Sequence, residues 1–180
     1  MSDPVYKRIL IKISGEALAA DKKTGFDFDF IANVCKTVKS CVDMGVEVGI
    51  VVGGGNFWRG VKDGAGHVER VSADRMGMLA TAMNCLAVAD VFKQIGAKAT
   101  IQTAVDIQGV GERYSTTEAI KHLENGEVVM FGCGTGSPFF STDTAAVLRA
   151  AEIGADAILL AKNIDGVYSA DPRVDASAVK

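Results

Sequence analysis

Residues 46–56 read Val46-Glu47-Val48-Gly49-Ile50-Val51-Val52-Gly53-Gly54-Gly55-Asn56, an apolar run that ends in three glycines. The β-branched residues of this run predict a buried strand. Glycines directly after a strand leave backbone N–H groups uncovered by any Cβ atom, so a phosphate group can approach them closely. An anion-binding site is one interpretation of these glycines, and a simple turn after a buried strand is the other.

Two further segments have the same form. Residues 12–16 (Lys12-Ile13-Ser14-Gly15-Glu16) follow a predicted strand at 6–13, and residues 132–136 (Gly132-Cys133-Gly134-Thr135-Gly136) follow another at 127–131. In a parallel sheet, ligands bind beyond the carboxyl ends of the strands. The three segments therefore predict one shared crevice.

The rest of the chain alternates between helical and strand patterns. Apolar spacing and terminal glycines predict helices at 29–44, 73–95, 115–125 and 142–153, and strands at 98–102 and 156–160. This rhythm predicts an α/β fold, a three-layer α/β/α sandwich with a mainly parallel sheet. No linker or internal repeat divides the chain, so residues 1–180 are expected to form one domain. Residues 59–72 are predicted to be a loop or a solvated connector, and the apolar residues of the 73–95 helix are expected to lie on one face.

Composition limits the classes of function. The 180 residues are 48% hydrophobic with a formal net charge of −3, which is ordinary for a globular domain and argues against a nucleic-acid polymer as partner. No apolar stretch approaches the length of a membrane span and no signal sequence is evident, so we expect no membrane contact. The four cysteines lack C-x-x-C spacing, which favours reduced thiols and a cytoplasmic location.

Charged residues near the glycines are candidates for chemistry. Lys12 ends the first predicted strand, where its ammonium group could meet a phosphate; alternatively it is a solvent-exposed lysine of an edge strand. Ser141 or Thr142 is expected to cap the last predicted helix, whose N-terminus favours an anion. Asp143 either stabilises that first turn or orients Lys12 and the phosphates.

Together these residues resemble the bacterial uridylate (UMP) kinases, a family of the amino acid kinase superfamily. The resemblance covers essentially the whole chain and rests on five motifs in the family's order: Lys12-Ile13-Ser14-Gly15-Glu16-Ala17-Leu18, Gly53-Gly54-Gly55-Asn56-Phe57-Trp58-Arg59-Gly60, Asp74-Arg75-Met76-Gly77-Met78-Leu79-Ala80-Thr81, Gly134-Thr135-Gly136-Ser137-Pro138-Phe139-Phe140-Ser141-Thr142-Asp143 and Asp165-Gly166-Val167-Tyr168-Ser169-Ala170-Asp171-Pro172.

The resemblance implies an amino acid kinase fold and the transfer of the ATP γ-phosphoryl group to UMP, giving UDP and ADP in pyrimidine nucleotide biosynthesis. It implies three catalytic residues, Lys12, Arg59 and Asp143. The implied ATP-binding residues are Lys12, Ile13, Ser14, Gly15, Gly55, Arg59, Lys162, Tyr168 and Asp171. The implied UMP-binding residues are Gly54, Asp74, Thr135, Gly136, Ser137, Pro138, Phe139, Phe140, Ser141 and Thr142. Mg²⁺ is expected to arrive with ATP and not to occupy a dedicated protein site.

The resemblance also implies regulation and assembly. It suggests GTP as an activator, UTP as an inhibitor and a homohexamer with the second predicted helix at the dimer contact. Met76, Met78 and Met83 of that helix suit such a contact, and a place in the core is the alternative. Residues 19–28 are more charged than is usual in the family, which bears on the GTP response. Family members extend beyond the Asp171-Pro172 turn, so the chain is expected to lack the C-terminal part of the domain.

The sequence leaves two alternatives to a UMP kinase. A related enzyme could phosphorylate a carboxylate or carbamate, although Pro138-Phe139-Phe140 favours UMP. A non-catalytic nucleotide-binding protein is the second alternative, against which Lys12, Arg59 and Asp143 argue. A dinucleotide-dependent reductase is disfavoured, because the chain lacks both G-x-G-x-x-G and an acidic ribose ligand.

Overall fold

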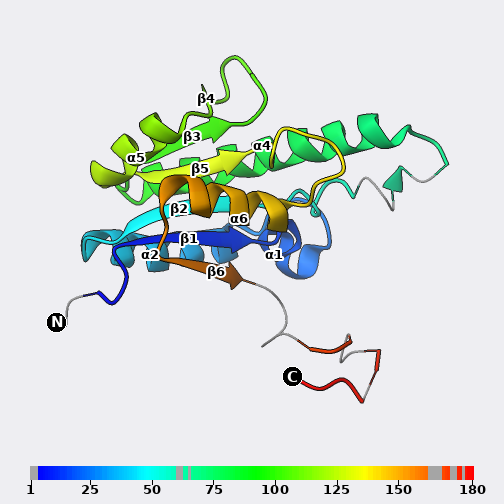
Figure 1. Cartoon of the computed structure of the whole chain (residues 1–180), viewed down its shortest axis with the longest axis horizontal. Coiled ribbons are helices and arrows are strands. Elements are labelled where there is room, and N and C mark those ends of the chain that lie inside the picture. The colour runs from blue at the N-terminus through cyan, green and yellow to red at the C-terminus, as the bar shows by residue number, and fades with distance from the viewer. Residues whose placement is uncertain (1–3, 60–62, 65, 162–167, 171–173, 176) are drawn as a thin grey trace.

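Six parallel strands form the centre of the structure, a computed structural model that describes residues 4–59, 63–64, 66–161, 168–170, 174–175 and 177–180. The strand order is β4-β3-β5-β2-β1-β6, and every pairing is parallel (Figure 1). The strands span β1 Arg8–Ile13, β2 Glu47–Val52, β3 Ala99–Thr103, β4 Glu112–Arg113, β5 Val128–Gly132 and β6 Ala157–Ala161. The helices are α1 Gly15–Ala19, η1 Ala20–Lys22, α2 Phe28–Asp43, α4 Arg70–Gln94, α5 Thr116–Glu124 and α6 Thr142–Ile153.

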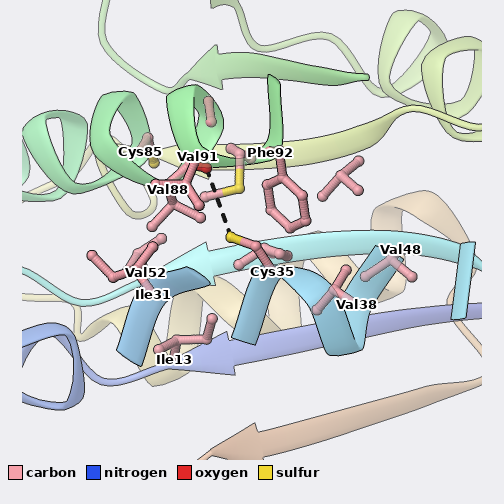
Figure 2. Packing of buried hydrophobic residues seen from close by; sticks show 14 of the residues in the cluster. Ile13, Ile31, Cys35, Val38, Val48, Val52, Cys85, Val88, Val91 and Phe92 are labelled. Carbon is pink, nitrogen blue, oxygen red and sulfur yellow. Dashed lines mark hydrogen bonds between the residues drawn. The ribbon is translucent and has the colours of Figure 1, made fainter. Parts of the chain in front are cut away.

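Helices cover both faces of this sheet. One apolar cluster joins α2 and α4 to the strands, and the other joins α5 and α6 to the opposite face. Figure 2 shows the first cluster, in which the Cys35 thiol of α2 points at the Val88 carbonyl of α4, 3.9 Å away. The predicted three-layer α/β/α sandwich with a mainly parallel sheet is therefore confirmed.

The local signals in the sequence explain most element ends. Asp27 caps α2 by accepting a hydrogen bond from the Phe30 N–H group, and Ser141 caps α6 by accepting one from Thr144. Gly154 ends α6 in the left-handed conformation, with a φ of 65° that a glycine adopts without strain. Residues 115–118 (Ser115-Thr116-Thr117-Glu118) have the sequence of a capping box that is only half formed: Ser115 accepts from the Glu118 N–H group, while the Glu118 carboxylate pairs with Lys121.

The longest helix differs most from expectation. It begins at Arg70, so the last residues of the predicted 59–72 loop are helical. Its apolar residues do not share one buried face, because Ala80 and Phe92 are buried while Met76 and Met83 are 40% and 46% exposed. The core alternative for these two methionines is wrong. α4 contacts α2 on one side and strands β3 and β5 on another. Its third side is left uncovered.

The same helix bears on the membrane prediction. Among the described helices, α4 alone has the length and apolar composition of a membrane span, with a window of mean hydropathy 1.2, whereas no stretch of that length was expected. Because 56% of that window is buried within the domain, α4 packs as a core helix of this fold.

Candidate functional site

A cleft of about 380 Å³ opens at the carboxyl ends of β1, β2 and β5. It lies where the three glycine-rich segments meet, so the predicted shared crevice exists. Its lining contains Lys12, Ser14, Gly15, Glu16, Gly53, Gly54, Gly55, Trp58, Arg59, Ala73, Asp74, Gly77, Met78, Thr81, Cys133, Gly134, Thr135, Ser137, Phe140, Ser141 and Thr142.

The glycines after β1 and β2 have two different roles. A Cβ atom on Gly54 would lie 2.9 Å from the Gly77 carbonyl oxygen of α4, and one on Gly15 would lie 2.6 Å from the Gly53 oxygen and the Gly55 nitrogen. These positions therefore need glycine for backbone packing. A Cβ atom on Gly55 would meet only the Glu16 and Arg59 side chains, at 3.4 Å or more, on the cleft side. Close packing and an open approach for an anion thus occur within three residues.

Lys12 is a buried cation at the base of the cleft. It lies on β1, between β2 and β6, and only 7% of the residue is exposed. This placement rules out the alternative of a solvent-exposed edge lysine. The Lys12 Nζ atom lies 2.7 Å from the Asp143 Oδ1 atom in the first turn of α6. The pair joins two segments that are far apart in the sequence and supplies a fixed positive charge.

Arg59 is the second cation of the cleft. Its guanidinium group pairs with the carboxylate of Glu16, and both side chains are nearly half exposed. An exposed ion pair contributes little free energy, so a phosphate group can replace the carboxylate at small cost. Glu16 belongs to the first of the five motifs, but no local pattern predicts that it neutralises Arg59.

Asp74 faces the loop of residues 133–141. Its carboxylate accepts hydrogen bonds from Arg70 Nε, at 2.9 and 3.0 Å, and from the Phe139 N–H group, at 2.8 Å. The Arg70 guanidinium also lies over the Phe139 ring, 5.1 Å from its centroid. Asp74 therefore links the first turn of α4 to the loop after β5.

A buried pair of amides supports the glycine segment from below. Asn56 and Asn84 exchange hydrogen bonds at 2.7 and 3.0 Å, and Asn84 also donates to the Gly53 carbonyl at 2.6 Å. Asn84 is fully buried on α4 and was not predicted. The sequence signal that could have identified Asn84 is a polar residue on an otherwise apolar face of the helix.

The structure does not bring every predicted residue to the cleft wall. Gly136, Pro138 and Phe139 belong to the adjoining loop without lining the cleft, and the Ile13 side chain lies in the core. Tyr168 is also absent from the lining, whereas Lys162 and Asp171 lie outside the described residues. Sequence reasoning missed Trp58, Ala73, Met78, Thr81 and Cys133 as lining residues.

Cys133 has an unusual environment for a lining residue. Burial raises the pKa of its thiol, so the neutral form is present at neutral pH. Its backbone φ of 64° is in the left-handed region, and its N–H group donates to Thr81 Oγ1 at 2.8 Å. Cys133 thus contributes a neutral, weakly polar surface and no nucleophile.

In the described part of the chain, no cluster of three or more histidine, cysteine, aspartate or glutamate side chains has the arrangement of a metal site. The cleft carboxylates of Glu16 and Asp74, and Asp143 beside them, each pair with a basic side chain.

Known proteins share this fold and much of this sequence. A UMP kinase from Bacillus anthracis is 40% identical, with a TM-score of 0.89, over 96% of this chain and 72% of that one. A UMP kinase from Ureaplasma parvum is 34% identical, with a TM-score of 0.88, over 97% of this chain and 74% of that one. The sequence profile of the amino acid kinase family matches residues 7–180, and the chain belongs to this family.

Proposed function

We propose that the protein is a UMP kinase, which transfers the γ-phosphoryl group of ATP to the phosphate of UMP and releases ADP and UDP. The observation that carries the proposal is the cleft itself, where a buried Lys12 fixed by Asp143 lies between two phosphate-accessible backbone segments. The identity of 40% and 34% with two UMP kinases supports the choice of acceptor.

Phosphoryl transfer requires positioning and charge stabilisation and little covalent chemistry from the protein. The acceptor oxygen of UMP attacks the γ-phosphorus in line with the departing ADP oxygen. Lys12 stabilises the negative charge that gathers on the transferring group, and Asp143 keeps the ammonium group in place. Arg59 exchanges its pairing with Glu16 for a phosphate, to which a guanidinium group can donate two hydrogen bonds.

The arrangement of the cleft supports a division between the two nucleotides. Gly54 lies against α4, which carries Asp74, whereas Gly55 faces Glu16 and Arg59. We assign UMP to the side of α4 and of residues 135–142, and ATP to the side of residues 12–15, Gly55 and Arg59. Lys162, Tyr168 and Asp171 stay part of the ATP assignment on the strength of the resemblance.

Mg²⁺ would enter with ATP and supply positive charge between the phosphate groups. It prefers phosphate oxygens with at most one or two carboxylates. Because Glu16, Asp74 and Asp143 are paired with basic side chains, these residues fit a cation held mainly by the nucleotide.

Assembly, regulation and place in the cell belong to the same proposal. Four residues of α4 that are 40–53% exposed, Met76, Leu79, Met83 and Leu86, form an apolar stripe at helical spacing and suit a contact between two copies, as in a homohexamer. We propose a cytoplasmic enzyme of pyrimidine nucleotide biosynthesis with GTP as activator and UTP as inhibitor. Sedimentation of the wild type and of Leu79→Asp tests the assembly, which the aspartate should weaken.

A coupled assay of ADP release with UMP, CMP, dTMP and glutamate as acceptors tests the function. We expect turnover with UMP at least tenfold faster than with any other acceptor. Turnover with glutamate alone would instead show a carboxylate kinase, and nucleotide binding by calorimetry without turnover would show a binding protein. Addition of GTP or UTP to the same assay measures their effect on the rate.

A further inference from the structure

The loop of residues 133–141 has a backbone conformation that its sequence disfavours. Cys133 and Phe139 have φ values of 64° and 71°, and Gly134 and Gly136 have values of 58° and 81°. A left-handed conformation is costly for a residue with a side chain and persists only where the surroundings hold it. The contacts that hold this loop therefore determine the shape of one wall of the cleft.

Three side chains outside the loop bond to its backbone. Thr81 accepts from the Cys133 N–H group and Asp74 accepts from the Phe139 N–H group, both at 2.8 Å. Arg149 donates from its Nη2 atom to the Gly134 carbonyl oxygen at 3.4 Å. Thr81 and Asp74 themselves line the cleft, whereas Arg149 does not. Arg149 therefore contacts the loop without forming part of the cleft surface.

Arg149 is held rigidly from several directions. It lies on α6 and is 4% exposed, and its guanidinium group donates to Glu152 at 2.5 Å. The same group stacks on the Tyr114 ring, 3.6 Å from the centroid, and the Tyr114 hydroxyl donates to Glu152 at 2.5 Å. The Tyr114 ring in turn packs edge-on against Phe131 of β5. This network aims one guanidinium nitrogen at the Gly134 carbonyl, near the start of the strained loop.

A buried charge of this kind is not required for stability, because an apolar residue of similar volume often stabilises a core equally well. We propose that Arg149 is a positioning residue, which fixes loop 133–141 at Gly134 and thereby sets the affinity for the acceptor nucleotide. The inference rests on the assignment of UMP to this loop. Without the contact the glycines let the loop adopt other conformations, and binding of the acceptor must then order it at the expense of affinity.

The experiment compares wild type with Arg149→Lys, which keeps the charge but loses the forked reach of the guanidinium group. We expect the KM for UMP to rise about tenfold, while kcat and the KM for ATP change less than about twofold. Backbone amides of residues 134–140 should exchange hydrogen about tenfold faster in the free protein. Val147→Ala on the same helix is the matched control, because its side chain is 58% exposed and is not part of this network; it should leave all of these values within about twofold.

A second variant changes the loop without touching Arg149. A Cβ atom on Gly136 would lie 2.9 Å from the Ala104 carbonyl oxygen, so Gly136→Ala displaces the loop and should also raise the KM for UMP selectively. Wild-type loop exchange and an unchanged KM for UMP in Arg149→Lys would overturn the inference, as would equal increases in both KM values. Failure of wild type to phosphorylate UMP would contradict the proposed function alone, because hydrogen exchange of the loop is measured without a nucleotide.

Discussion

The segment after β2 and the loop after β5 line the same cleft but obtain their shapes differently. Residues 53–55 have no positive φ, and their path is set by backbone atoms of Gly15 and of α4 that approach too closely for a side chain. Residues 133–141 include two side-chain-bearing residues at positive φ, held by Thr81, Asp74 and Arg149. Packing makes the first wall rigid, whereas side-chain hydrogen bonds shape the second.

This difference has a consequence for substitution. A change at Gly15, Gly53 or Gly54 should damage the fold and the site together, because the atoms that a new side chain would meet first belong to the backbone. A change around residues 133–141 should alter affinity for one substrate and spare the fold. The Lys12–Asp143 pair joins β1, the neighbour of β2, to the first turn of α6, which follows the 133–141 loop, so it is the most sensitive point.

Lys12→Ala should have the largest effect. Loss of the ammonium group removes a fixed charge from the transferring phosphoryl group, so kcat should fall by about 10²–10³-fold. The fold should survive, because the Asp143 side chain is 46% exposed and the loss of one cation does not bury its charge in the core. Steady-state kinetics with UMP and ATP measure the loss, and circular dichroism checks the fold.

Asp143→Asn is the control, because it keeps Lys12. It should reduce kcat by only about tenfold, as expected for one charged hydrogen bond. A normal kcat in Lys12→Ala would remove Lys12 from the catalytic residues.

Gly15→Ala tests the packing of the first region. Its Cβ atom would meet two backbone atoms at 2.6 Å, so the 53–55 segment must shift. We expect a loss of about 1–3 kcal/mol in the free energy of unfolding, as for overpacking elsewhere. Urea denaturation gives the value. Gly77→Ala on α4 is the control, because its Cβ atom finds only the Trp58 ring at 3.8 Å; this variant should be neutral or more stable. Equal stability of both variants would contradict the packing account.

Asp74→Ala tests the second region. The KM for UMP should rise about tenfold, because the loop loses its Phe139 contact and the acceptor loses a carboxylate. The KM for ATP and the free energy of unfolding should change little. Asp90→Ala on the same helix, where the carboxylate contacts only Gln94, serves as the control. An unchanged KM for UMP would limit Asp74 to pairing with Arg70.

Phe139→Gly should have the smallest effect. The change relieves a positive φ, but it removes the ring beneath Arg70 and increases the freedom of the unfolded chain. These contributions oppose one another, so the free energy of unfolding should change by less than about 1 kcal/mol. Thermal denaturation measures it. A loss as large as that of Gly15→Ala would mean that the two regions are held in the same way.

Much of the fold was readable from local patterns. Apolar spacing, β-branched runs and terminal glycines located five of the six strands and four helices within a few residues. The two-residue strand β4 and the five-residue helix α1 were missed, because elements this short have no detectable period. The mistaken reading of α4 has a different cause: an apolar residue looks the same whether it packs on the sheet or remains uncovered.

The α/β fold, the shared crevice at the strand ends and the residues that resemble a kinase follow from residue type and spacing along the chain. The folded molecule was needed to show that Lys12 is buried against Asp143, that Gly15 and Gly54 serve backbone packing, and that Asn84 and Arg149 support the cleft walls. These are contacts between segments far apart in the chain, which no local periodicity encodes.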